Sequence, residues 1–162
     1  MTVAVGDKIP DVEVKVLGAD GMPTSVSTGE VLGSGKVVLF GVPGAFTPAC
    51  SGAHLPSFVN GADSLAGKGV DAIVCVAIND AWVLDAWADA HGAKGKITML
   101  ADGNGTFADA MGLAFDGSGF GLGKRSLRYA AVIEDGVISR LEVEESPINV
   151  DVSSCQFVLS TL

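Results

Sequence analysis

The chain has 162 residues, 48% of them hydrophobic and 18% charged, so it is long enough and apolar enough to fold around a substantial core. Its 10 basic and 19 acidic residues give a formal net charge of −9 without any basic cluster, which argues against a nucleic acid or an anionic membrane as a partner. No apolar run approaches the roughly 18 residues that cross a bilayer, and residues 1–7 carry no secretory signal, so we expect a single cytoplasmic domain over residues 1–162.

Hydrophobic patterning predicts an alternation of strands and helices. Residues 11–17 alternate, as in a half-exposed strand, whereas residues 71–78 are continuously apolar, which is typical of a central parallel strand. The predicted elements, in chain order, are strands at 11–17 and 36–42, a helix from Pro48 to about Ala66 with a kink at Pro56, a strand at 71–78, a helix at 81–91, a strand at 96–100, a helix after Asn104 to about Met111, strands at 124–133 and 137–143 joined by the turn Asp135-Gly136, and a terminal helix that starts near Ser153. This order indicates an α/β domain of the thioredoxin-like arrangement, in which helices flank a central mixed β-sheet.

Cys50 occupies the most informative position in the chain. It ends the run Pro43-Gly44-Ala45-Phe46-Thr47-Pro48-Ala49-Cys50, directly after the predicted strand at 36–42. We expect Thr47 to be the N-cap and Pro48 the first helical residue, which makes Cys50 the third residue of the helix. Unpaired backbone N–H groups and the helix dipole favour a thiolate there, and the thiolate is the nucleophile. The alternative is a small buried cysteine without reactivity.

The remaining cysteines offer no obvious disulfide or metal site. Cys50, Cys75 and Cys155 lie 25 and 80 residues apart without a C-x-x-C pair, which fits a reducing compartment. A disulfide oxidoreductase would need such a pair, and Thr47 stands where its first cysteine would be. Zinc is a weak alternative, because Cys50 and His54 form the only close pair of ligands.

A reactive thiolate needs a cation nearby, and its electrophile needs a group that polarises the leaving group. Arg125 and Arg128 follow the glycine-rich stretch 112–123 and flank the start of a predicted core strand. Spacing alone leaves either arginine open for this task, and a solvated surface arginine is the alternative for each.

Four segments together resemble the peroxiredoxins. The pattern Pro43-x-x-x-Thr47-x-x-Cys50 is similar to the signature of that family, and the fuller stretch 41–51 resembles its type II subfamily. Further similar segments are Val-Ala-Ile-Asn-Asp-Ala-Trp-Val at 76–83, Leu-Ala-Asp-Gly at 100–103, and Gly-Leu-Gly-Lys-Arg-Ser-Leu-Arg-Tyr-Ala at 121–130. These segments occur in the family's order along nearly the whole chain.

The resemblance implies a thiol peroxidase that needs neither a metal nor an organic cofactor. It matches Cys50 to the cysteine that attacks a peroxide and becomes a sulfenic acid, and Thr47 to the threonine that bonds the sulfur and the peroxide. It matches Pro43 to the proline that shields the pocket from water, and Arg125, rather than Arg128, to the arginine that favours the thiolate and orients the peroxide. The implied substrates are hydrogen peroxide and organic hydroperoxides, and the implied role is antioxidant defence.

The sulfenic acid must then meet a thiol, either internal or from a partner. Cys75 lies in the middle of an apolar strand and is expected to be a buried structural thiol, while Cys155 is expected about a turn too late in the chain to match the family's resolving cysteine. The resemblance therefore favours recycling by glutathione and glutaredoxin. Thioredoxin, with or without an internal disulfide, and a peroxide-sensing role are the alternatives.

Two aromatic residues and one histidine near the motif have several explanations. Phe46 and Phe120 lie on predicted loops, where they could form a partner surface or line a substrate mouth, and the resemblance implies a homodimer through this region. His54, one helical turn after Cys50, is expected to pack or line the pocket rather than transfer a proton.

Overall fold

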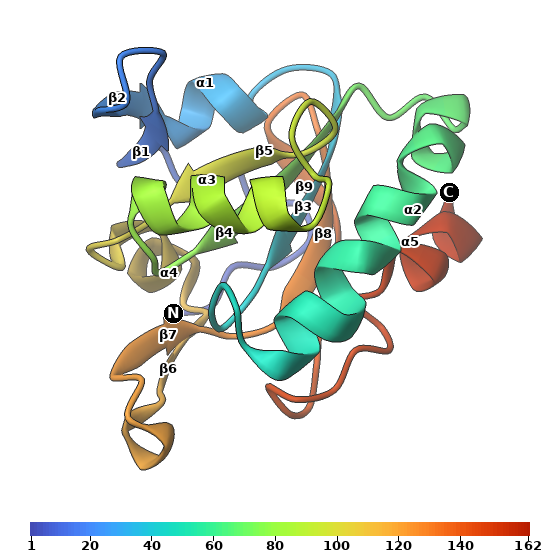
Figure 1. Cartoon of the computed structure of the whole chain (residues 1–162). Coiled ribbons are helices and arrows are strands. Elements are labelled where there is room, and N and C mark those ends of the chain that lie inside the picture. Colours follow the sequence, from blue (N-terminus) through green and yellow to red (C-terminus); the bar gives the residue numbers. More distant parts are fainter.

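The computed structural model describes residues 1–162 and contains a seven-stranded mixed sheet with helices on both faces (Figure 1). The strand order across the sheet is β2-β1-β5-β4-β3-β8-β9. In chain order the elements are β1 (Glu13–Leu17), β2 (Pro23–Ser27), α1 (Thr28–Leu32), β3 (Lys36–Gly41), the π-helical turn η1 (Cys50–His54), α2 (Leu55–Gly67), β4 (Ala72–Ala77), α3 (Ala81–Ala90), β5 (Thr98–Ala101), α4 (Thr106–Met111), β6 (Ala114–Asp116), the 3₁₀ turn η2 (Ser118–Phe120), β7 (Lys124–Ser126), β8 (Tyr129–Glu134), β9 (Val137–Val143) and α5 (Cys155–Thr161). This is the thioredoxin-like α/β fold, and that prediction is confirmed. None of the helices has the length and apolarity of a membrane-spanning helix.

The middle of the sheet is parallel and both of its edges are antiparallel. β3, β4 and β5 run in the same direction, whereas β8 pairs with β3, and β9 with β8, in antiparallel register. The continuously apolar strand predicted at 71–78 is β4, at the centre of the sheet. Such a strand needs apolar cover on both faces, because neither face meets water.

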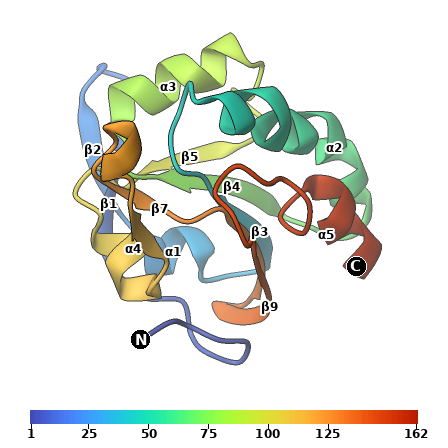
Figure 2. The same cartoon turned by 90° about the horizontal axis from the view of Figure 1, so that it is seen from below.

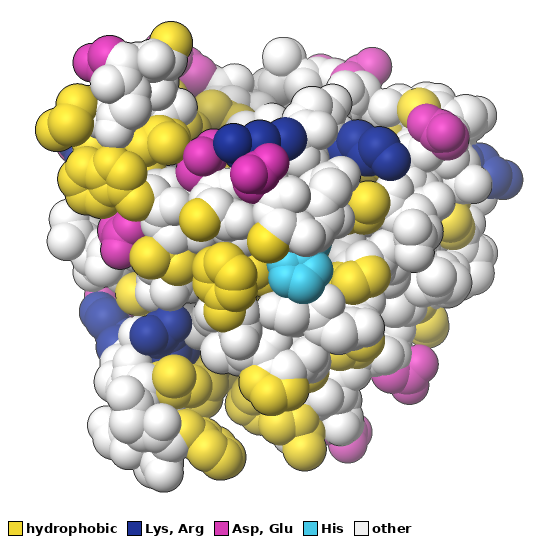
Figure 3. Space-filling model, viewed as in Figure 1, with side chains coloured by type: hydrophobic (Ala, Val, Ile, Leu, Met, Phe, Trp, Pro, Cys, Tyr) yellow, Lys and Arg dark blue, Asp and Glu magenta, His cyan; other side chains and the backbone are white.

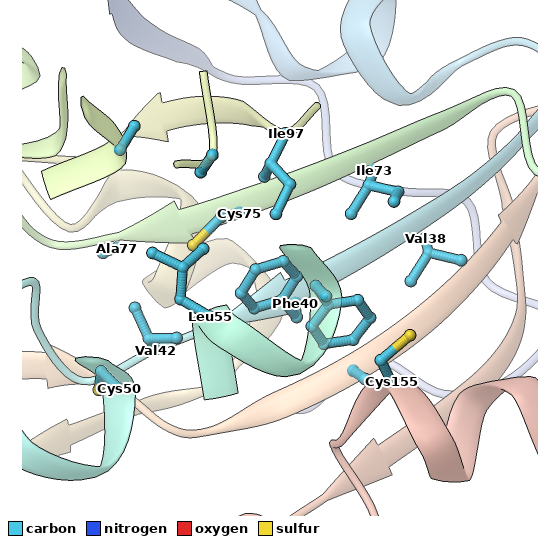
Figure 4. Packing of buried hydrophobic residues seen from close by; sticks show 14 of the residues in the cluster. Val38, Phe40, Val42, Cys50, Leu55, Ile73, Cys75, Ala77, Ile97 and Cys155 are labelled. Atoms are coloured by element: carbon cyan, nitrogen blue, oxygen red, sulfur yellow. The ribbon is translucent and has the colours of Figure 1, made fainter. Parts of the chain in front are cut away.

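Two hydrophobic cores supply that cover, one beneath the helices on each face of the sheet, and Figure 2 shows these helices. On one face, Phe40 and its neighbours pack against α2, α3 and α5 through Phe58, Trp87 and Val158. On the other face, residues of the same strands pack against α1 and α4 through side chains that include Leu32. Cys50, Cys75 and Cys155 all belong to the first core (Figure 4).

The structure differs from the sequence prediction after the glycine-rich stretch. One strand was expected over residues 124–133, but β7 ends at Ser126 and β8 begins at Tyr129. β7 pairs with β6 in a separate two-stranded sheet, whereas β8 joins the main sheet beside β3. The break at Leu127 and Arg128 therefore separates Arg125, on the small sheet, from Arg128, which immediately precedes β8 of the main sheet.

β2 and α1 were not predicted from the sequence. β2 is short and polar, and it acquires strand geometry by pairing along its whole length with β1. α1 spans only Thr28–Leu32 and is held by the Ser27 cap, whose side chain accepts a hydrogen bond from the amide of Glu30. Elements this short carry too little periodicity to be recognised without their partners.

Candidate active site

The loop after β3 brings Cys50 to the carboxyl edge of the parallel strands. The amide of Ala45 donates a 2.9 Å hydrogen bond to Oδ1 of Asn79, which follows β4, so two strand ends hold the loop. The helix begins at Pro48 as predicted, and the amide of Ser51 donates to the carbonyl of Thr47 at 2.9 Å. Cys50 is therefore the third helical residue, at the positive end of the helix dipole.

The disturbance predicted at Pro56 takes the form of a π-helical turn. Pro56 lies at the start of α2 and has no N–H to donate, and the preceding residues, Cys50–His54, adopt the wider π-helical pattern. This turn carries both Cys50 and His54, and both side chains are fully buried. Wider turns of this kind occur often at functional sites.

The guanidinium of Arg128 contacts the sulfur of Cys50. Its Nη2 donates to Sγ at 3.0 Å, its Nη1 donates to Nδ1 of His54 at 2.8 Å, and its Nε donates to the carbonyl of Pro147 at 2.9 Å. The three bonds leave the planar group little freedom to rotate. Arg128 is only 2% exposed, so its charge acts in a medium where electrostatic interactions are strong.

The assignment of this contact to Arg125 is wrong. Arg125 is half-buried on β7, where its Nε donates to the carbonyl of Leu122 at 3.0 Å and its Nη1 to the carbonyl of Pro43 at 3.3 Å. The physical reason is the strand break, because only β8 pairs with β3, with Tyr129 opposite Gly41. Arg128, one residue before Tyr129, consequently lies beside the loop that leaves β3. Arg125 instead supports that loop from the small sheet.

His54 is buried and uncharged, and its two ring nitrogens link Arg128 to Ser153 by hydrogen bonds. An arginine can only donate, so Nδ1 of His54 accepts from Arg128, and Nε2 carries the proton and donates to the carbonyl of Ser153 at 2.9 Å. Burial, and next the positive charge of Arg128, lower the pKa of His54 to about 3, against a smaller opposing effect of the Ser153 carbonyl. Both ring nitrogens are thus occupied, and we find no free lone pair for a metal. The sequence predicts only that His54 packs or lines the pocket, and the structure adds hydrogen bonds to Arg128 and Ser153.

Arg128 is a buried cation without a carboxylate partner. Its hydrogen-bond partners are a neutral imidazole, a backbone carbonyl and the sulfur of Cys50, and it takes part in none of the ion pairs of the structure. An isolated buried charge is costly unless a counter-charge compensates it. Cys50 is the one partner of Arg128 whose side chain can become anionic and so compensate this charge.

The low pKa of His54 predicts a pH-dependent stability. Between pH 6.5 and about 3 the unfolded chain binds the histidine proton and the folded chain does not, so lowering the pH favours unfolding. We expect the wild-type protein to lose up to about 1.4 kcal/mol of unfolding free energy per pH unit in this range relative to the variant His54→Gln. Denaturant titrations of both proteins at neutral pH and about pH 5 would measure this, since the carboxylates of the two proteins cancel in the difference. Equal pH slopes would contradict the neutral buried assignment.

A mostly apolar cavity of about 530 Å³ opens beside the cysteine. Pro43, Thr47 and Arg128 line it together, and the hydroxyl of Thr47 donates to the carbonyl of Gly44 at 2.6 Å. The remaining lining residues are Pro48, Ala49, Phe115, Phe120, Leu122, Pro147 and Ile148. Figure 3 shows hydrophobic side chains gathered on both sides of a hollow at the lower edge of the molecule, near the β6–β7 segment. A small polar group can therefore meet Arg128 while an apolar substituent remains in the cavity.

Neither of the other cysteines is placed as a partner for Cys50. Cys75 is fully buried in β4, where burial, and next the Cys50 sulfur, raise the pKa of its thiol well above the ordinary value. Cys155 is the first residue of α5, and burial raises the pKa of its thiol to about 11. In Figure 4, Leu55 and Phe40 lie between Cys50 and Cys155. All three thiols are free.

Comparison with known proteins agrees with this fold. The Redoxin family model matches residues 4–159. Peroxiredoxin-2E-2, chloroplastic, of Oryza sativa subsp. japonica is 47% identical over 148 residues, which cover 89% of this chain and 66% of that protein. Peroxiredoxin-2B of Arabidopsis thaliana is 37% identical over 160 residues, which cover 99% of this chain and 98% of that protein. Among solved structures, reduced Prx3 of Vibrio vulnificus in complex with H₂O₂ has a TM-score of 0.92 at 44% identity and covers 99% of both chains.

These similarities assign the chain first to a broad class of proteins and then to a family within it. The match over residues 4–159 makes the chain a redoxin, the class to which its thioredoxin-like fold points. The similarity to full-length relatives is more specific, and the chain belongs to the peroxiredoxin family. It spans only about two thirds of the rice relative's length, 66%.

Proposed function

We propose that the chain is a thiol-dependent peroxidase of the type II peroxiredoxin subfamily, with residues 1–162 acting as one domain and Cys50 as the nucleophile. The observation that carries this proposal is the 3.0 Å contact between Nη2 of buried Arg128 and Sγ of Cys50. A further support is the similar Prx3 of Vibrio vulnificus, whose structure holds H₂O₂.

In the proposed first step, the Cys50 thiolate attacks the terminal oxygen of a hydroperoxide ROOH. The S–O bond forms as the O–O bond breaks, and RO⁻ leaves and takes up a proton to give ROH, while Cys50 becomes a sulfenic acid. Because the Thr47 hydroxyl gives its own hydrogen to Gly44, its oxygen is available to accept the O–H of the peroxide. Arg128 is placed to stabilise the negative charge that develops on the leaving oxygen.

The proposed substrates are hydrogen peroxide and organic hydroperoxides. A hydrogen peroxide molecule is far smaller than the 530 Å³ cavity, and the apolar side chains of Phe115, Phe120 and Leu122 suit an alkyl or aryl substituent. Pro43 lines the same cavity and would exclude water from the reacting atoms. The activity corresponds to a role in antioxidant defence and redox homeostasis.

In the proposed second step, the sulfenic acid is reduced from outside the chain. An external thiol attacks the sulfenic sulfur, releasing water and forming a mixed disulfide, and a second thiol then restores Cys50. The burial of Cys75 and Cys155 supports this route over an internal disulfide. Glutathione with glutaredoxin is the preferred reductant, and thioredoxin is the alternative.

A steady-state peroxide assay with a panel of reductants tests this function. We expect the wild-type protein to consume many equivalents of peroxide per chain with glutathione and glutaredoxin, and fewer with thioredoxin. Consumption of a single equivalent with every reductant would instead indicate a peroxide sensor, which oxidises once and stops. If Cys50 did not react with peroxide at all, the proposal would be contradicted.

A homodimer is the proposed assembly, formed around the mouth of the cavity. Phe46, Phe120 and Ile148 are large hydrophobic side chains with 55%, 82% and 73% of their surface exposed. Phe120 and Ile148 line the cavity, and large exposed apolar side chains favour a protein contact. Sedimentation velocity of the reduced protein would measure the mass, and a monomer at micromolar concentration would contradict the assembly.

We propose that the protein is cytoplasmic, because a reducing compartment would keep its three buried cysteines as free thiols. The rice relative is chloroplastic by name, and the chloroplast is the competing location. Fractionation of the source cells, followed by detection of the chain, would decide between the two.

A further inference from the structure

The segment between β9 and α5 supplies two of the groups that hold the site. The carbonyl of Pro147 accepts from Nε of Arg128 at 2.9 Å, and the carbonyl of Ser153 accepts from Nε2 of His54 at 2.9 Å. Without these acceptors, two buried donors would lack partners and the guanidinium could turn away from Cys50. The position of Arg128 therefore depends on the path of residues 145–153.

This segment has no helix or strand of its own to fix its path. Glu144 provides the anchor instead, because Oε2 of its side chain accepts from the amide of Asp151 at 2.6 Å, from the amide of Ser153 at 3.1 Å and from the hydroxyl of Ser153 at 2.7 Å. A charged acceptor makes each of these bonds stronger than a neutral one would be. A single carboxylate oxygen of Glu144 thus fixes the path of the loop at Asp151 and Ser153.

Glu144 is also tied directly to the strand that carries the arginine. Its amide donates to the carbonyl of Arg128 at 3.0 Å, which continues the β8–β9 pairing by one step. Its side chain is buried, and all its partners in the structure are uncharged loop groups. The burial of a carboxylate without a cation is costly unless hydrogen bonds satisfy it. Here the satisfied bonds shape the loop that orients Arg128 and His54.

We propose that Glu144 is a positioning residue for the cysteine site. It fixes the path of residues 145–153, so that the carbonyls of Pro147 and Ser153 hold Arg128 and His54 in their positions beside Cys50. This inference rests on the proposed function of Cys50 and extends it to a residue that touches neither sulfur nor peroxide. A purely structural role would stabilise the loop without altering the chemistry of the thiol.

The test compares the pH profile of Cys50 alkylation by iodoacetamide in the full chain. In Glu144→Ala we expect the midpoint of the profile to rise by about one pH unit, which makes alkylation about tenfold slower at pH values below both midpoints. Glu144→Gln should restore the wild-type profile, because its amide oxygen can take the place of Oε2. The matched control is Glu145→Ala, which removes the same residue type at the neighbouring exposed position and should leave the profile unchanged.

A second variant keeps the test decisive if Glu144→Ala does not fold. Ser153→Ala removes one donor to Glu144 but keeps the carbonyl that holds His54, and it should shift the profile in the same direction by a smaller amount. A wild-type profile in a folded Glu144→Ala protein, or in Ser153→Ala where the former is unfolded, would overturn the proposal. Alkylation needs no peroxide, so this result stays separate from a failure of the wild-type protein to reduce peroxide.

Discussion

Replacement of Cys50 by serine is expected to abolish peroxide reduction. A serine hydroxyl is not ionised at neutral pH and is a poor nucleophile there, so Arg128 and His54 would surround a group that cannot attack the O–O bond. We expect the rate of peroxide consumption to fall by roughly 10⁴-fold or more, to the background of the assay. Stopped-flow measurement with the reduced protein would show this loss directly.

The matched controls are Cys75→Ala and Cys155→Ala. Neither thiol accepts a hydrogen bond from Arg128, as Cys50 does, so the first oxidation step should keep most of its rate in each variant. Loss of that step in a folded Cys75→Ala or Cys155→Ala protein, or its survival in Cys50→Ser, would contradict the assignment of the nucleophile.

The second large effect is expected at Arg128. Arg128→Met keeps most of the side-chain volume but removes the charge and the donors that hold the sulfur and His54. We expect the rate constant of Cys50 oxidation by peroxide to fall by about 10²–10³-fold, comparable to the loss of a donor that stabilises developing charge. The thiolate absorbance of Cys50 at neutral pH should fall with it.

Arg125→Met is the comparison that separates the two arginines. Arg125 supports the Pro43 carbonyl at 3.3 Å, so its replacement should cost less than about tenfold. If Arg125→Met lost more activity than Arg128→Met at equal stability, the arrangement described for the sulfur would not be the reactive one.

The sequence alone predicted most of the fold, and it identified Cys50 as the candidate nucleophile. The apolar run at 71–78 and the turn Asp135-Gly136 each predicted elements that the structure contains. Cys50 was recognisable because its local signals, a strand end, Thr47 and Pro48, all lie within a few residues of it. Local signals of this kind survive without knowledge of the partner strands.

The choice of arginine could not be made in the same way. Arg125 and Arg128 are three residues apart, and only the break at Leu127, with the pairing of Tyr129 opposite Gly41, decides which of them meets Cys50. One signal was present in the sequence. The apolar β8 sequence begins immediately after Arg128, which marks Arg128 as the residue just before that strand. Arg125 instead precedes the polar Ser126.

The hydrogen bonds of His54 were not predicted because they join residues far apart in the sequence, and Glu144 was not singled out at all. His54 is 74 residues from Arg128 and 99 from Ser153, and nothing in the local sequence indicates either contact. Glu144 acts through loop amides, which every residue other than proline possesses, so no residue pattern announces it. Contacts of this kind, which act on the site through another residue, can be identified only in the folded structure.

The most direct measurement is to add one equivalent of hydrogen peroxide to the reduced wild-type protein, trap sulfenic acid with a specific reagent, and map the labelled peptide by mass spectrometry. A thiolate at Cys50 held by Arg128 predicts one label per chain, on the peptide that contains Cys50. Labels on Cys75 or Cys155 in place of Cys50, or a protein that stays fully reduced, would contradict it.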